Sequence, residues 1–297
     1  MKPTQASSTA KVIAASTLLL FSQKATRHLV PVEATSLCEQ FLSTCTADRL
    51  LAWSARNPLT RIFWRTMERL THPGIVQHFW HRKRWIEEVC SNAIDDGYER
   101  LLIVGAGFDT LGIRCLTRYP SLTVVELDHP ATQSVKRAAL QASPAPPTGI
   151  TWMAVDLSVQ PFPVDDLHSP KRTIVVLEGL LMYLPQQAVL ELLGNLTHIS
   201  SQPVRIVLSY MQAWPDGSIG FRPRSALISL WLRFTSEPFQ WAITPADVAA
   251  FLVPAGLHVL RHVDCRSLSV SAQNPQGTGL DGENVLLCES RPGSKQT

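Results

Sequence analysis

Five short runs of aliphatic residues constrain the fold of this chain more than any other feature of its sequence. They are Leu101–Val104, Leu122–Val125, Ile150–Val155, Thr173–Leu177 and Val204–Leu208. None alternates apolar with polar residues, so each is expected to be a strand that is covered on both faces. Helical or loop sequence separates each run from the next, an order typical of a parallel, doubly wound α/β sheet.

Two later runs, residues 257–264 and 283–289, are expected to add a pair of strands. The segment before the second of them, Ser271–Glu283, holds three glycines and one proline, and no helix is expected between the two strands. Strands joined without a crossover helix pair antiparallel. The sequence therefore predicts a mostly parallel seven-stranded sheet rather than a six-stranded dinucleotide-binding fold.

Residues 1–95 are expected to form a helical cap or substrate lid, ahead of a nucleotide-binding domain over residues 96–297. Apolar residues recur at helical spacing in segments 10–24, 36–55, 59–70 and 75–95. The apolar stretch Val12–Phe21 is too short to span a bilayer, and no small-x-small cleavage site follows it. We therefore expect it to be a helix that packs on the body of the protein.

An insertion at residues 211–245 precedes the sixth expected strand and is rich in aromatic side chains. They are Trp214, Phe221, Trp231, Phe234, Phe239 and Trp241. Pockets of α/β proteins form at the carboxyl ends of strands, where such insertions lie. These side chains are expected either to pack as an ordinary cap or to form an apolar wall around a bound substrate.

Charge and cysteine content exclude several classes of protein. A formal net charge of +3 gives no case for nucleic-acid binding across the whole surface. The basic cluster at Arg61–Arg84 is either a solvated helix face or a local anion site. The six cysteines include no C-x-x-C pair, so we expect reduced thiols in a cytoplasmic protein and no metal site.

The sequence Gly105-Ala106-Gly107 follows the first strand and opens a helix. Glycines let the backbone approach a ligand closely, and a helix N-terminus offers free N–H groups. The dinucleotide fingerprint needs a third glycine, but this chain has Thr110 there, preceded by Asp109. A carboxylate repels a pyrophosphate but not a sulfonium or ammonium group, which favours S-adenosyl-L-methionine over NAD.

Acidic residues end the next two strands. Glu126 and Asp128 lie about 20 residues beyond the first glycine, where a carboxylate accepts hydrogen bonds from a ribose diol. Asp156 and Leu157 end the third strand, where Asp156 either accepts from an adenine amino group or caps a helix. The residues favour a bound nucleotide but do not decide between Glu126 and Asp128.

Taken in order, these segments resemble the leucine carboxyl methyltransferase family. The matching pieces are Arg82–Glu88, Gly105–Thr110, Arg114, Glu126–Asp128, Val155–Leu157 and Glu178–Leu184. The resemblance covers roughly residues 70–215 and implies a Rossmann-like class I methyltransferase fold. It also implies S-adenosyl-L-methionine as cofactor, with S-adenosyl-L-homocysteine as product and no metal.

The resemblance further implies roles for single residues. Arg82 would pair with the cofactor carboxylate, and Gly105, Ala106 and Gly107 would line its methionine part. Glu178, with Asp109, would lie near its cationic end. Tyr183 would lie toward the methyl acceptor. The chain departs from the family pattern at Leu111 and Ile113, and the family's N-terminal basic position falls on Ser16 or Thr17.

An O-methyltransferase of a small molecule is therefore the expected function, within secondary metabolism. Since no histidine–acid pair stands out, the expected acceptor is a carboxylate or an acidic hydroxyl or enol, acidic or carrier-bound. Alternatives are an NAD-dependent oxidoreductase, a non-catalytic binding module, and a carboxyl methyltransferase of a protein C-terminus or a modified tRNA nucleoside. Neither a membrane nor a nucleic-acid partner is expected.

Overall fold

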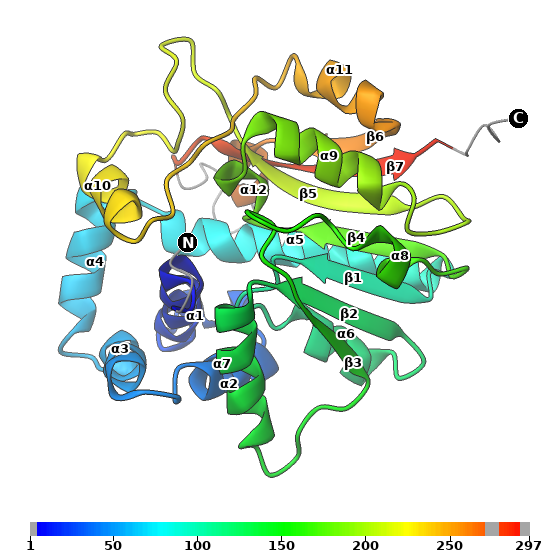
Figure 1. Cartoon of the computed structure of the whole chain (residues 1–297). Helices are drawn as coiled ribbons and strands as arrows, with labels where there is room; N and C mark the ends of the chain where they lie inside the picture. Colours follow the sequence, from blue (N-terminus) through cyan, green and yellow to red (C-terminus); the bar gives the residue numbers. More distant parts are fainter. Residues whose placement is uncertain (1–4, 271–278, 292–297) are drawn as a thin grey trace, which may run out of the picture.

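A seven-stranded sheet organises the computed structural model, which describes residues 5–270 and 279–291. The strands are β1 (Arg100–Val104), β2 (Thr123–Asp128), β3 (Ile150–Ala154), β4 (Thr173–Leu177), β5 (Arg205–Met211), β6 (Leu257–Val263) and β7 (Glu283–Ser290). Their order is β3-β2-β1-β4-β5-β7-β6 (Figure 1). The first five pair in parallel and β7 pairs antiparallel with both neighbours, which confirms the predicted sheet.

Two helical layers cover the sheet because its strands carry apolar residues on both faces. In β1, Leu102 and Val104 pack in one core with α9 (Gln186–Leu196) and α11 (Val248–Leu252). Leu101 and Ile103 pack in the other with α5 (Ile75–Asp95) and α6 (Leu111–Arg118). Further helices after β1 include α7 (Pro130–Gln141), α8 (Val164–Leu167) and α10 (Ala226–Phe234).

The N-terminal helices gather beyond the carboxyl ends of the parallel strands (Figure 1). They are α1 (Ser8–Phe21), α2 (Val32–Phe41), α3 (Thr46–Arg56) and α4 (Arg61–Leu70), which lead into α5. As predicted, the apolar stretch in α1 packs on the body, because Leu18, Leu19 and Leu20 are buried against α2 and its neighbours. No helix in the described ranges is long and apolar enough to cross a bilayer.

Two expectations about helices are wrong. Segment 36–55 is not one helix: α2 ends at Phe41 and α3 begins at Thr46, after Cys45 caps the amide of Asp48. A short helix, α12 (Cys265–Ser269), also lies between β6 and β7. It forms because the Asp264 carboxylate accepts a 2.7 Å hydrogen bond from the amide of Ser267, an N-cap that stabilises even one turn.

Cysteine thiols are free throughout the described residues, and Cys115 and Cys288 are buried.

Candidate cofactor and acceptor site

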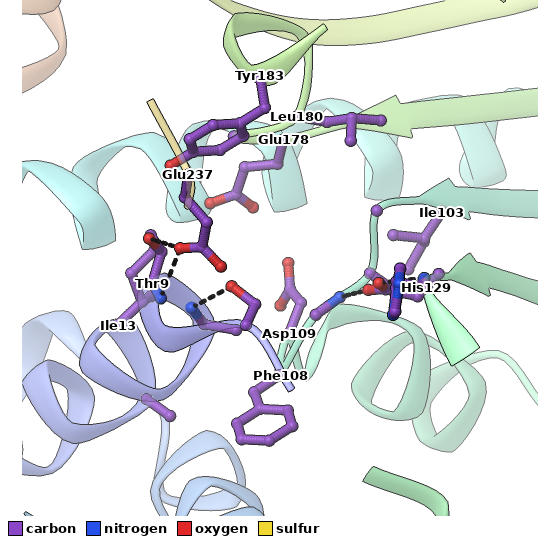
Figure 2. Close-up of a pocket in the computed structure, with 18 of the residues that line it drawn as sticks. Thr9, Ile13, Ile103, Phe108, Asp109, His129, Glu178, Leu180, Tyr183 and Glu237 are labelled. Atoms are coloured by element: carbon purple, nitrogen blue, oxygen red, sulfur yellow. Dashed lines mark hydrogen bonds between the residues drawn. The ribbon is translucent and has the colours of Figure 1, made fainter. Parts of the chain in front are cut away.

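A cavity of about 250 Å³ lies at the carboxyl ends of β1, β2 and β4, under α1. One end, here the glycine end, contains Gly105, Gly107, Asp128 and Asp156. The opposite end, here the Glu237 end, contains Thr9, Tyr183 and Glu237. Figure 2 shows Glu178 and Asp109 pointing into the space between them. The cavity therefore joins the edge of the sheet to segments that lie outside it.

The glycine turn has a backbone that other residues would strain. Gly105 and Gly107 have φ angles of +73° and +46°, in the left-handed region. A Cβ atom on Gly105 would lie 3.0 Å from the Cδ1 atom of Leu180. The amide of Gly107 donates to the Asp128 carboxylate. Both glycines and Ala106 line the cavity wall, where the glycines present backbone without a Cβ.

The structure distinguishes Glu126 from Asp128, the two acids that the sequence offers as alternative partners of a ribose. Asp128 lines the cavity, where burial raises the pKa of its carboxyl group. Glu126 is not among the lining residues; it is 1% exposed and lies 2.6 Å from the Nζ atom of Lys136. Glu126 lies two residues before Asp128 on the same face of β2, further from the carboxyl end of the strand. Of the two candidates for ribose binding, the structure therefore places Asp128 at the cavity wall and Glu126 away from it.

Asp156 and Leu157 both line the glycine end. The Asp156 carboxylate accepts from the amide and hydroxyl of Ser158, at 3.0 and 2.6 Å, and lies 3.3 Å from the Nε2 atom of His129. A turn follows Leu157 rather than a helix, so the helix-cap alternative for Asp156 is wrong. Its carboxylate closes that turn and still borders the cavity.

A buried network of charges lies between the two ends. Arg82 donates from Nε to Glu178 Oε1 at 2.9 Å and from Nη1 to both oxygens of Glu283 at 2.5 Å. Lys83 bridges Asp109 Oδ2 and Glu178 Oε2, each at 3.1 Å. Glu178 is therefore buried and paired while it also lines the cavity. Sequence reasoning stopped at Arg82 and missed Lys83, although the string Arg82-Lys83-Arg84 carried the signal.

Ionisation in this network follows from burial and pairing. Burial opposes the charge on Glu283, but the Arg82 guanidinium and His78 lower the pKa of Glu283 to about 2. Burial likewise opposes ionisation of Asp109, yet Lys83 holds the pKa of its carboxyl well below its ordinary value. Burial raises the pKa of Glu178. The network thus keeps two cations and three acids together at the floor of the cavity.

The Glu237 end brings together residues that no sequence motif connects. The amide and hydroxyl of Thr9, in α1, donate to Glu237 Oε2 at 3.1 and 2.5 Å across 228 residues (Figure 2). Burial raises the pKa of the Tyr183 hydroxyl above its ordinary value, and Tyr183 lines the same end of the cavity as Thr9. Thr9 and Glu237 were missed, since neither lies at a strand end.

The aromatic side chains of the insertion do not wall this cavity. Its lining from that region consists of Ser236, Glu237, Pro238 and Gln240. Phe221 and Trp241 are instead buried in apolar cores, and Phe234 is 73% exposed. The packed-cap alternative therefore describes the buried aromatics, and polar residues of the same insertion reach the cavity. From the N-terminal side, Thr17 lines the cavity and Ser16 does not.

Within residues 5–270 and 279–291, no group of three or more His, Cys, Asp or Glu side chains is arranged to hold a metal ion.

Comparisons with known proteins agree on one family. A family model described as leucine carboxyl methyltransferase matches residues 18–197. The Bacillus subtilis protein YktD, named provisionally as an S-adenosyl-L-methionine-dependent methyltransferase, is 26% identical over 187 residues, 61% of each chain. A Mycolicibacterium smegmatis protein with the same provisional name is 31% identical over 159 residues, 50% of this chain and 49% of that one. The chain therefore spans 61% or less of these relatives' lengths.

Among solved structures, the apo form of the S-adenosylmethionine-dependent methyltransferase SibL is 20% identical, with a TM-score of 0.46. The match covers 80% of this chain and 60% of that one.

Proposed function

Since this chain belongs to the leucine carboxyl methyltransferase family, we propose that it transfers the methyl group of S-adenosyl-L-methionine to an oxygen atom of a small molecule. The observation that carries this proposal is the glycine end of the cavity. There a glycine turn without Cβ atoms meets the carboxylates of Asp128 and Asp156 at the edge of a parallel sheet. This is where α/β sheets bind nucleotides.

The residues present fit the cofactor. Asp128 would accept hydrogen bonds from the ribose hydroxyls, while Asp156 and Leu157 would face adenine. Gly105 and Gly107 would let the backbone approach the methionine part, and a Cβ on Gly105 would crowd Leu180 at 3.0 Å. When bound, the cofactor supplies an electrophilic methyl group on a sulfonium sulfur.

Acids near the middle of the cavity suit a cationic ligand. Asp109 and Glu178 lie 3.1 Å from the same ammonium group of Lys83, which makes the pair a site that already accepts a cation. Arg82 and Lys83 are the cations nearest to it and would meet the cofactor carboxylate. A pyrophosphate would face Asp109, so this arrangement supports a sulfonium cofactor over NAD.

The protein's own work is alignment and exclusion of water. Helix α1 contributes Thr9, Ile13 and Thr17 to the lining and covers the strand ends. We propose that residues 1–95 act as the cap over the cavity, so that the acceptor oxygen reaches the methyl group in a water-poor space. Such alignment is the main source of rate in displacement reactions of this kind.

Calorimetry and a labelled methyl donor test the proposal together. Titration of the full chain with S-adenosyl-L-methionine should show saturable binding, and titration with NAD should show none. A cell extract incubated with the protein and a deuterated-methyl donor should then yield metabolites with the mass shift of one labelled methyl group. Binding of NAD alone, or cofactor binding without any labelled product, would contradict the proposed function.

A further inference from the structure

The Glu237 end has a carboxylate whose second oxygen is directed into the cavity. Thr9 uses both of its donors on Oε2 of Glu237. Figure 2 shows the other carboxylate oxygen of Glu237 pointing toward the open space above Asp109. Glu237 is 8% exposed, and its side chain lines the cavity. A polar group of a bound ligand is the natural partner for such an acceptor.

The charges around the cavity disfavour an anion at this end. The lining includes the acids Asp109, Asp128, Asp156, Glu178 and Glu237. Its two strong cations, Arg82 and Lys83, are each held by two carboxylates at the floor. Among the described residues that line this end of the cavity, beside Thr9, Tyr183 and Glu237, there is no lysine or arginine. Two like charges a few ångströms apart in a dry site repel strongly.

Tyr183 cannot serve as the proton acceptor beside Glu237. Burial, with a smaller effect from Glu237, raises the pKa of the Tyr183 hydroxyl, so this group keeps its proton near neutral pH. Thr9, whose amide and hydroxyl both donate to Glu237 Oε2, is a positioning residue. The Glu237 carboxylate is therefore the side chain at this end to which the proton of an acceptor can pass.

We propose that Glu237 is the base for a neutral hydroxyl acceptor, an alcohol or phenol, and that a carboxylate is not the substrate. This inference rests on the proposed methyl transfer and narrows the expected acceptor class. The acceptor oxygen forms its bond to the methyl carbon with a lone pair, and the carbon–sulfur bond pair stays on sulfur. The acceptor O–H bond breaks, and its proton passes to Glu237 Oε1, so charge and atoms balance.

Binding of two small probes of similar size tests the acceptor class without turnover. With the protein saturated by S-adenosyl-L-homocysteine, 4-methylphenol should bind at least tenfold more tightly than benzoate in ligand-observed NMR titrations. Glu237→Gln keeps the side-chain shape and removes the charge, so it should reduce this ratio severalfold. Tighter binding of benzoate, or a ratio unchanged in the variant, would overturn the inference.

A second experiment separates a base from a structural clamp between α1 and the insertion. Glu237→Gln should slow methyl transfer about 100-fold at pH 7, in the range for loss of a general base. The rate should recover as rising pH ionises the acceptor itself, while cofactor affinity stays within about twofold. Glu191→Gln, an exposed site on α9, is the matched control and should match the wild type. A pH-independent loss, or loss of cofactor affinity as well, would assign Glu237 a structural role.

The chemistry of the products distinguishes this inference from the proposed function. Labelled products formed from a cell extract should be ethers, which survive mild alkali. Methyl esters, which release methanol under the same conditions, would overturn the hydroxyl inference and leave the methyltransferase proposal standing. The absence of any labelled product, with cofactor binding intact, would remove both.

Discussion

The glycine end and the Glu237 end of the cavity are built from different kinds of sequence. At the glycine end, Asp128 is the last residue of β2, and Gly105 and Asp156 follow β1 and β3 within two residues, so the sheet itself fixes them. At the Glu237 end, Thr9 and Glu237 come from a cap helix and an insertion, 228 residues apart. The sheet therefore positions one half of the site, and segments outside the sheet position the other half.

The largest change in stability is expected for a variant of Glu126. It tests whether this residue stabilises the fold around the glycine end without contacting the cofactor. Glu126→Gln leaves the buried ammonium of Lys136 without a charge partner and should cost about 3–5 kcal/mol of unfolding free energy. Thermal and urea denaturation would measure it. Replacing both partners, by Glu126→Leu with Lys136→Met, should recover most of the loss.

Cofactor affinity is the decisive second measurement on these variants. The folded double variant should bind S-adenosyl-L-methionine within a few-fold of the wild type. Loss of affinity with stability preserved would return Glu126 to the ligand site and undo the separation from Asp128.

A pH prediction concerns the charge network that joins the two ends. The folded pKa of Glu283 is lowered to about 2 from its ordinary 4.5, so its contribution to stability is present above pH 4.5 and lost as the pH falls toward 2. By linkage the contribution is about 3 kcal/mol. Glu283→Gln should therefore lower the melting temperature at pH 6 and flatten its dependence on pH between 5 and 2. Parallel melting curves for the variant and the wild type would show that Glu283 is not the group responsible.

Asp128→Asn tests the glycine end directly. The variant should bind S-adenosyl-L-homocysteine about 30-fold more weakly, about 2 kcal/mol, because a charged acceptor of two hydroxyl donors is lost. Calorimetry measures the change, and Asp166→Asn, an exposed residue on α8, is the matched control. Equal affinities for the two variants would be incompatible with a ribose contact at Asp128.

The smallest change is expected from loss of the N-cap of α1, the helix that carries Thr9. Ser7 caps α1 by accepting from the amide of Ala10 at 3.1 Å, and Ser7→Ala should cost about 1 kcal/mol. Because α1 carries Thr9, the acceptor KM should rise a few-fold while cofactor affinity stays unchanged. Asp264→Ala removes a cap far from the lining and should alter stability alone. If Ser7→Ala changed both the acceptor KM and the cofactor affinity, the two ends of the cavity would be coupled.

The sequence predicted the sheet and most of the glycine end because both depend on local patterns. Aliphatic runs without alternation predicted the parallel strands, and a glycine turn after β1 predicted the cavity edge. The choice between Glu126 and Asp128 as the cavity residue required the three-dimensional structure, because residues two apart on a strand point to the same face of the sheet. Only the structure showed that the Glu126 carboxylate is paired with the ammonium group of Lys136.

At the other end, sequence patterns could not have found Glu237. Its segment after α10 has no regular period, and its partner Thr9 lies in another layer of the fold. The insertion was identified from its aromatic residues, which pack elsewhere, while its polar residues reach the cavity. Contacts that depend on tertiary packing of a cap leave no short-range signature.

The segment matched by the family model runs from residue 18 to residue 197, so it includes neither Thr9 nor Glu237. Two proteins could therefore fit that model equally well and still select unrelated metabolites. Sorting such proteins by chemistry calls for comparing the residues that precede the match and those that follow it. A truncated protein trimmed to the matched boundaries would keep Gly105, Asp128 and Asp156 and lose Thr9 and Glu237, the residues of the end proposed to receive the acceptor.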